Sequence, residues 1–153
     1  EMGTRVSLRL PICEPWDQTT APAAKPMANS SQRSMMVLVM DDDELIRCTM
    51  APLLELLGHR AECVDSGEAA LETLANGFQP DVVVLDMNMP GLGGAGTLPL
   101  LRELRPTTPV LLATGRLDQF ASDQASAFPY VTLLAKPFSI DDLQQHLEQL
   151  GPG

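Results

Sequence analysis

Six polar side chains lie at or just after the ends of apolar runs, although the runs are far apart in the sequence: Asp41, Asp42, Asp43, Asp86, Thr114 and Lys136. Carboxylates that are packed together repel one another and raise each other's pKa unless a cation neutralises them. A hydroxyl and an ammonium group that face such carboxylates are suited to hold a phosphoryl group. If the fold brings these segments together, they can bind a divalent cation and carry out phosphoryl chemistry.

The ligand atoms indicate which cation and which reaction fit this set. A few hard oxygen ligands, with space left for water and phosphate oxygens, suit Mg²⁺ or Mn²⁺ better than zinc. A carboxylate can itself be the nucleophile of phosphoryl transfer, forming an acyl phosphate. Asp86 is the natural acceptor because it stands alone at the end of its run. Thr114 offers a hydroxyl donor, and Lys136 is the only lysine in residues 35–153.

Short apolar runs alternate with amphipathic stretches through the second part of the chain. Most runs are continuously apolar, as strands covered on both faces must be. Strands are expected at 35–40, 61–64, 82–85, 110–113 and 131–135, and helices at 44–57, 67–75, 96–104, 118–127 and 140–150. This alternation predicts an α/β fold, a doubly wound three-layer sandwich with a five-stranded parallel sheet and five helices. Its active groups should lie at the carboxyl ends of the strands.

Composition divides the chain near residue 34. Residues 1–34 hold four basic and three acidic side chains, whereas residues 35–153 hold six and 17, a net charge of −11. No Val, Ile, Leu or Phe occurs between Cys13 and Ser34, where proline accumulates, so residues 12–34 are expected to be a flexible linker and residues 35–150 the domain. Such an acidic domain argues against nucleic-acid binding.

Two further features concern location and isolated polar residues. No apolar run approaches the 18 or more residues of a membrane span, and three widely spaced cysteines favour neither a disulfide framework nor a zinc site. We therefore expect a cytoplasmic segment without membrane contact. Neither His59 nor His146 is spaced from other polar residues in a way that indicates a metal ligand or a nucleophile, and both are expected to be exposed.

Four motifs stand in order along the domain: VLVMDDD at 37–43, VLDMNMPG at 84–91, VLLAT at 110–114 and AKPF at 135–138. Together they resemble the response-regulator receiver domain of two-component phosphorelays. The resemblance covers nearly all of residues 35–150. It implies the flavodoxin-like strand order 2-1-3-4-5, an order that the periodicity of the chain does not reveal.

The resemblance also implies a role for each matching residue. Asp86 is similar to the phosphoacceptor, which takes its phosphoryl group from the phosphohistidine of a histidine kinase or phosphotransfer domain. Asp42 is similar to the direct Mg²⁺ ligand, Asp41 to the acid that acts through water, and Asn88 to the residue whose carbonyl completes the ligands. Thr114 and Lys136 are similar to the hydroxyl and the lysine that pair with the phosphoryl group. Such a receiver catalyses its own phosphorylation and dephosphorylation.

Residues 3–11, GTRVSLRLP, alternate as a strand should and are similar to the closing strand of a histidine-kinase ATP-binding domain. Residues 1–11 would then be the last strand of that domain, and the chain the C-terminal piece of a hybrid sensor kinase. Three alternatives remain open: a stand-alone response regulator without an output domain, a pseudo-receiver that binds partners without phosphorylation, and a Mg²⁺-dependent phosphatase with an aspartyl nucleophile. The phosphatase would need a D-x-D arrangement that begins at its nucleophile on the first strand.

Overall fold

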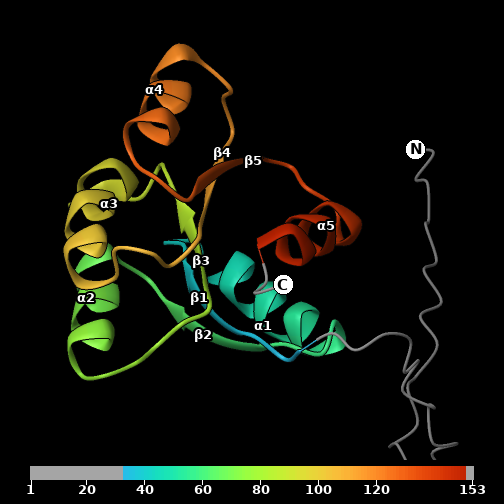
Figure 1. The fold of residues 1–153 in the computed structure, drawn as a ribbon. Helices are drawn as coiled ribbons and strands as arrows, with labels where there is room; N and C mark the ends of the chain where they lie inside the picture. The colour runs from blue at the N-terminus through green and yellow to red at the C-terminus, as the bar shows by residue number, and fades with distance from the viewer. Residues whose placement is uncertain (1–32, 151–153) are drawn as a thin grey trace, which may run out of the picture. The chain divides into compact units, whose positions relative to one another are not determined.

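Strands and helices alternate through residues 33–150, which are the residues that the computed structural model describes (Figure 1). The strands are β1 (Met36–Met40), β2 (Arg60–Val64), β3 (Val82–Asp86), β4 (Val110–Thr114) and β5 (Val131–Ala135). The helices are α1 (Glu44–Leu56), α2 (Gly67–Ala75), α3 (Gly93–Leu104), α4 (Gln119–Ala127) and α5 (Ile140–Leu150). The strand predicted at residues 1–11 and nearly all of the predicted linker lie outside the described residues.

All five strands are parallel and form one sheet in the order β2-β1-β3-β4-β5. The predicted α/β class and the flavodoxin-like order are therefore confirmed. Every residue of β3 and β4 is buried, which explains why these two runs are apolar without alternation. The central position of β3 places its last residue, Asp86, in the middle of the carboxyl edge of the sheet.

Alternation of side chains along each strand divides the core into two layers. Val37 and Val39 of β1 pack on one face with buried residues of α1 and α5, whereas Leu38 and Met40 pack on the other face with α2 and α3. Because successive strand residues point to opposite faces, one apolar run fills both layers. No helix of residues 33–150 is both long and apolar enough to span a membrane.

Helix α3 begins at Gly93, three residues before the predicted start at 96. Glycine has low helix propensity, so the sequence predicts that residues 93 and 94 belong to the preceding loop. In the structure the first turn of α3 lies directly against the end of β3, and Gly94 is buried there. A tertiary contact thus decides the helix start against the local preference.

The expectation that His59 is exposed is wrong. The residue precedes β2 and is only 6% exposed, and its Nδ1 accepts a hydrogen bond from the backbone N–H of Met35 at 3.3 Å. Burial lowers the pKa of His59 below its usual value of 6.5. The acceptor role requires an unprotonated Nδ1, so neutral His59 holds the chain that enters β1.

Acidification should therefore destabilise the fold through His59. The unfolded chain binds a proton near pH 6.5, whereas folded His59 resists it, so the free energy of unfolding should fall as the pH drops below that value. His59→Asn retains a hydrogen-bond acceptor but cannot titrate. Its free energy of unfolding should therefore fall less between pH 7.5 and 5.5 than that of the wild type. Urea unfolding at several pH values measures this difference. His146→Asn is the control, and equal slopes for His59→Asn and the wild type would contradict the assignment.

Candidate functional site

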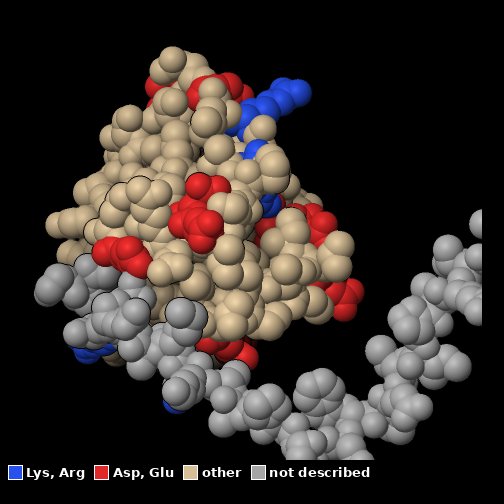
Figure 2. Space-filling model, turned by 90° about the vertical axis from the view of Figure 1, so that its right-hand side faces the viewer, with Lys and Arg blue, Asp and Glu red and all other residues tan. Residues whose placement is uncertain are grey.

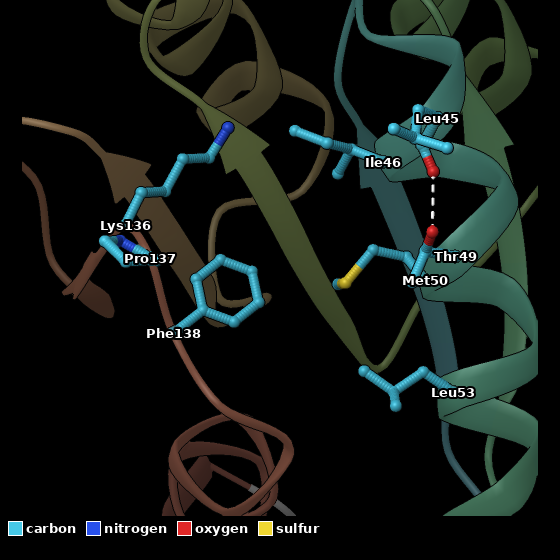
Figure 3. Close-up of a pocket in the computed structure, with 8 residues that line it drawn as sticks. All are labelled: Leu45, Ile46, Thr49, Met50, Leu53, Lys136, Pro137 and Phe138. Carbon is cyan, nitrogen blue, oxygen red and sulfur yellow. Dashed lines mark hydrogen bonds between the residues drawn. The ribbon is translucent and has the colours of Figure 1, made fainter. Parts of the chain in front are cut away.

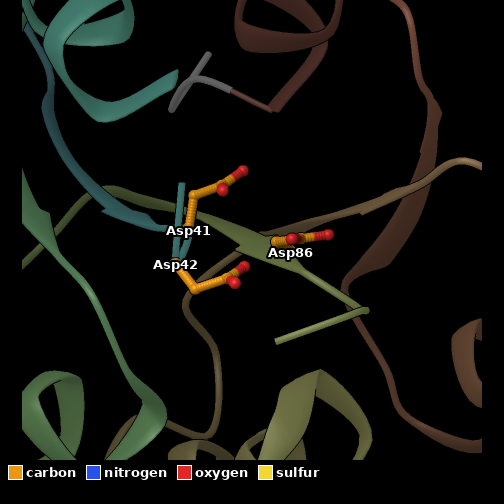
Figure 4. Close-up of side chains that lie close together, drawn as sticks. All are labelled: Asp41, Asp42 and Asp86. Atoms are coloured by element: carbon orange, nitrogen blue, oxygen red, sulfur yellow. The ribbon is translucent and has the colours of Figure 1, made fainter. Parts of the chain in front are cut away.

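Three carboxylates meet at the carboxyl edge of the sheet (Figure 4). Asp41 and Asp42 follow β1, and Asp86 ends the neighbouring strand β3. Each offers one oxygen, and these oxygens all lie within 4.8 Å of one another. Asp41 and Asp86 are buried, with exposures of 4% and 5%, whereas Asp42 is exposed. The predicted convergence of these three acids is therefore present.

Lys136 supplies the positive charge of this cluster. It follows β5, and its Nζ lies 2.8 Å from Asp41 Oδ2 and 3.2 Å from Asp86 Oδ1. Burial acts to lower the pKa of Lys136, but the hydrogen bond to Asp41 and the charge of Asp86 outweigh it, so the pKa of the lysine is raised. Lys136 therefore remains an ammonium ion and bridges the two buried acids.

The backbone at the end of β3 holds Asp86 in place. The N–H of Met87 donates to the carbonyl of Ala113 at 2.9 Å, which continues the sheet one residue beyond the strand. The N–H of Asn88 donates to Asp86 Oδ1 at 3.2 Å. Asn88 is thus adjacent to the acceptor acid, and the use of its carbonyl as a metal ligand stays a prediction.

Glycine is required where α3 meets this loop. A Cβ on Gly94 would lie 2.6 Å from the carbonyl oxygen of Asp86 and 2.6 Å from the Cα of Met87. These are backbone atoms and cannot rotate away, so any side chain at 94 would displace the segment that carries the acid. The run of glycines at 91–96 is therefore explained in part by close packing against the site.

Thr114 ends β4 at the same edge but does not reach the carboxylates through a hydrogen bond. Its Oγ1 donates to the carbonyl of Arg116 at 2.8 Å and accepts from the Arg116 N–H at 3.1 Å. The hydroxyl is buried and turned along its own loop. Gly115, between the two bonded residues, has open space at the position that a Cβ would take.

Two residues support the acidic turn: Asp43, one of the acids after the first apolar run, and Arg47, which the sequence analysis did not single out. Asp43 caps α1 by accepting from the Leu45 N–H at 2.9 Å, and its own N–H donates to Asp41 Oδ1 at 3.0 Å. Arg47 donates from its guanidinium to the main-chain carbonyl of Asp41 at 2.7 Å. The available signal was position: Arg47 lies one helical turn beyond the cap, so its long side chain can reach back to the turn.

This oxygen set fits a small hard cation. In an octahedral Mg²⁺ site with Mg–O distances of about 2.1 Å, adjacent ligands are about 3.0 Å apart and opposite ligands about 4.2 Å. The three carboxylate oxygens all lie within 4.8 Å of one another, which is near enough to share one such ion. The nearby ligands are all oxygens, with neither thiolate nor imidazole among these three residues. Asp42 and one carboxylate oxygen of Asp86 could bind the ion with the least disturbance of existing hydrogen bonds, because both oxygens of Asp41 already accept hydrogen bonds.

An apolar groove of about 530 Å³ lies beside the carboxylates, between α1 and the segment that follows β5 (Figure 3). Its walls are Leu45, Ile46, Thr49, Met50 and Leu53 on one side, and Lys136, Pro137 and Phe138 on the other. Leu45 is 74% exposed at the rim. Lys136 therefore borders both the charged cluster and an apolar surface open to solvent.

Comparison with known proteins identifies the family that this fold and site define. The model of the response regulator receiver domain matches residues 37–148. The chain belongs to this family, whose members act in two-component systems.

Named relatives agree with this assignment. The chain is 36% identical over 161 residues to the virulence sensor protein BvgS of Bordetella bronchiseptica, covering 97% of this chain and 13% of that protein. It is 34% identical over 117 residues to the response regulator MprA of a Mycobacterium species, covering 74% and 49% respectively. The structure of the chemotaxis protein CheY4 of Vibrio cholerae superposes with a TM-score of 0.71 at 27% identity, covering 77% of this chain and 99% of that one.

Gly94→Ala should destabilise the fold because its methyl group would overlap backbone atoms of the site. We expect the free energy of unfolding to fall by about 1–3 kcal/mol, the usual range for overpacking. Gly96→Ala is the matched control in the same helix, since its Cβ would meet only the flexible side chain of Leu92 at 3.2 Å. Urea denaturation of both variants checks the prediction, and equal stabilities would contradict it.

Lys136→Met should make the fold more dependent on Mg²⁺. Without the ammonium group, Asp41 and Asp86 repel each other, so the free energy of unfolding of the metal-free variant should fall by on the order of 2 kcal/mol. A fully buried pair would lose more, but the Lys136 side chain is 22% exposed, and solvent weakens its interactions. Added Mg²⁺ should then raise the Tm of Lys136→Met more than that of the wild type. Thermal unfolding with and without Mg²⁺ measures both, with the exposed Arg60→Met as the control. An equal rise in the two proteins would refute this interpretation.

Proposed function

We propose that this chain accepts a phosphoryl group from a phosphohistidine onto the carboxylate of Asp86. The observation that carries the proposal is the position of Asp86, buried at the centre of the carboxyl edge, with two further carboxylates within 4.8 Å and the Lys136 ammonium 3.2 Å away. A nucleophilic carboxylate, a cation site and a fixed positive charge are the requirements of phosphoryl transfer. Family membership supports the same chemistry.

In this mechanism an oxygen of Asp86 attacks the phosphorus, forming an acyl phosphate while the bond between phosphorus and the histidine nitrogen breaks. Mg²⁺, when bound, neutralises charge on the phosphoryl oxygens. Lys136, already paired with Asp86, offers its ammonium to the new dianion. Asp42 and Asp86 would hold the cation directly, Asp41 would act through water, and the carbonyl of Asn88 is the proposed third protein ligand. Hydrolysis, or transfer to another histidine, returns Asp86 to the carboxylate.

The added charge is the signal that the chain would transmit. A phosphoryl group brings about 1.5 to 2 negative charges at pH 7, which would attract the Thr114 hydroxyl away from Arg116. The two hydrogen bonds at Arg116 are then lost, and the loop that leads to α4 rearranges. Phosphorylation would thereby bias an equilibrium between two arrangements of α4, β5 and α5.

The larger context that we propose is a hybrid sensor histidine kinase in the cytoplasm. The match to the BvgS sensor covers 97% of this chain and so extends beyond the receiver segment at 37–148. That extent supports assigning residues 1–11 to the end of a kinase domain, 12–34 to a linker and 35–150 to the receiver. The match to the response regulator MprA supports the alternative, a regulator separate from its kinase.

The acidic surface of this chain supports a phosphoryl donor that is a protein with a basic surface. Carboxylates outnumber cationic side chains on the face drawn in Figure 2. Several of the described cations are engaged internally, with Arg47, Arg102 and Arg105 bonded to main-chain carbonyls and Lys136 to carboxylates. Complementary charge speeds association, whereas a polyanion such as nucleic acid would be repelled. The apolar groove beside Lys136 adds a surface suited to protein contact.

Acetyl phosphate with Mg²⁺ tests the acceptor role directly. Intact mass spectrometry should show one added phosphoryl group on the wild type and none on Asp86→Asn. Chelation of Mg²⁺ should reduce labelling by at least about 10-fold, because even the loss of a residue that only orients a metal ligand costs about 10- to 100-fold in affinity or activity. Asp118→Asn, at the cap of α4, is a control carboxylate outside the cluster. Labelling that persists in Asp86→Asn would place the acceptor elsewhere. Sustained turnover of small phosphomonoesters would favour the phosphatase instead.

A further inference from the structure

Asp42 is the least restrained of the three clustered acids. Asp41 accepts from the Asp43 N–H at 3.0 Å and from Lys136 at 2.8 Å, and Asp86 accepts from the Asn88 N–H and Lys136. No hydrogen bond or ion pair from residues 33–150 holds the exposed carboxylate of Asp42. Its direction therefore depends on the main chain that carries it.

That main chain is fixed at the peptide group between residues 41 and 42. The N–H of Asp41 still belongs to the sheet and donates to the Val64 carbonyl at 3.2 Å. Its carbonyl leaves the sheet and accepts from the Arg47 guanidinium at 2.7 Å. Since a peptide group is planar, holding this carbonyl also fixes the position of the Cα of Asp42.

Arg47 is well placed to keep this geometry. Its N–H donates to the Asp43 carbonyl at 3.1 Å in the first turn of α1, so the same residue joins the helix to the turn by main chain and by side chain. A hydrogen bond from a charged donor at 2.7 Å is shorter and stronger than a neutral one. The side chain is half-buried, which limits competition from water.

We propose that Arg47 is a positioning residue that sets the direction of Asp42 for Mg²⁺ through the carbonyl of Asp41. The inference rests on the proposed function, because it assumes that Asp42 is a metal ligand. Two effects of Arg47 on a bound cation have opposite signs. Its charge repels the cation, so that loss of the charge alone would tighten binding, whereas loss of the positioned turn would weaken it.

A titration with Mg²⁺ alone separates these two effects. The probe is added to the metal-free, unphosphorylated full chain, and amide NMR shifts give the Kd without any activity measurement. In Arg47→Met the Kd should rise roughly 10-fold, as for other residues that orient a metal ligand. Arg47→Lys keeps the charge and one donor but lacks the planar guanidinium, so its Kd should lie between those of Arg47→Met and the wild type. Arg60→Met, which removes an exposed arginine of β2, should leave the Kd unchanged.

Mg²⁺ binding by Arg47→Met that equals or exceeds that of the wild type would overturn the inference. If Arg47→Met does not fold, Arg47→Lys decides the matter by the same criterion, with urea unfolding to confirm that it is native. A purely structural arginine would lower the free energy of unfolding without changing the Kd. The wild-type titration and labelling of Asp86 test the proposed function separately, because a wild type that binds Mg²⁺ can still show no dependence on Arg47.

Discussion

Repulsion among three neighbouring carboxylates is the constraint on which this structure depends. Two of them, Asp41 and Asp86, are buried, where a charge without a partner costs several kcal/mol. Lys136 bridges both, and its raised pKa shows that attraction to the acids exceeds the cost of its own burial. One ammonium group cannot neutralise three carboxylates, so the cluster keeps an unbalanced negative charge that favours a cation.

The parallel sheet is what brings these charges together. Carboxyl ends of parallel strands share one edge, and the central position of β3 between β1 and β4 puts Asp86 beside both neighbours. Close packing at Gly94 then presses α3 against the loop after β3. The site is thus rigid at Asp86, held by main-chain bonds at Asp41, and least restrained at Asp42.

The segments that enter β4 and β5, at the opposite end of the sheet from the carboxylates, are held more firmly than the loop that follows β4. The buried Arg102 of α3 donates to the Thr108 carbonyl at 2.6 Å and to the Tyr130 carbonyl at 3.1 Å, which ties the segments that enter β4 and β5 to the helix. Tyr130 is held there with a φ of 59°, a left-handed backbone that is costly for a residue with a side chain. The Thr114 hydroxyl, in contrast, bonds to Arg116 of its own loop, while the Thr114 carbonyl stays in the sheet and accepts from the Lys136 N–H.

Much of this arrangement was predictable from local pattern. The continuously apolar runs gave the strands, and the order of acids, hydroxyl and lysine after them gave the residues of the site, because parallel strands must share an edge. The exposure predicted for His59 was wrong, and α3 starts earlier than its glycines suggested. In both cases a contact outside the residue's own element, with Met35 for His59 and with the end of β3 for Gly94, decided what the local pattern could not.

The sequence by itself determined which groups gather at the edge and the excess of negative charge that they carry. Only the tertiary structure decided how each group is held: Lys136 between Asp41 and Asp86, the Thr114 hydroxyl on Arg116, and Arg47 on the carbonyl of Asp41. Whether a hydrogen bond forms depends on differences of tenths of an ångström in the donor–acceptor distance and on the direction of the side chain. Such distances follow from the packing of helices on the sheet, which the pattern of residues along the chain does not specify.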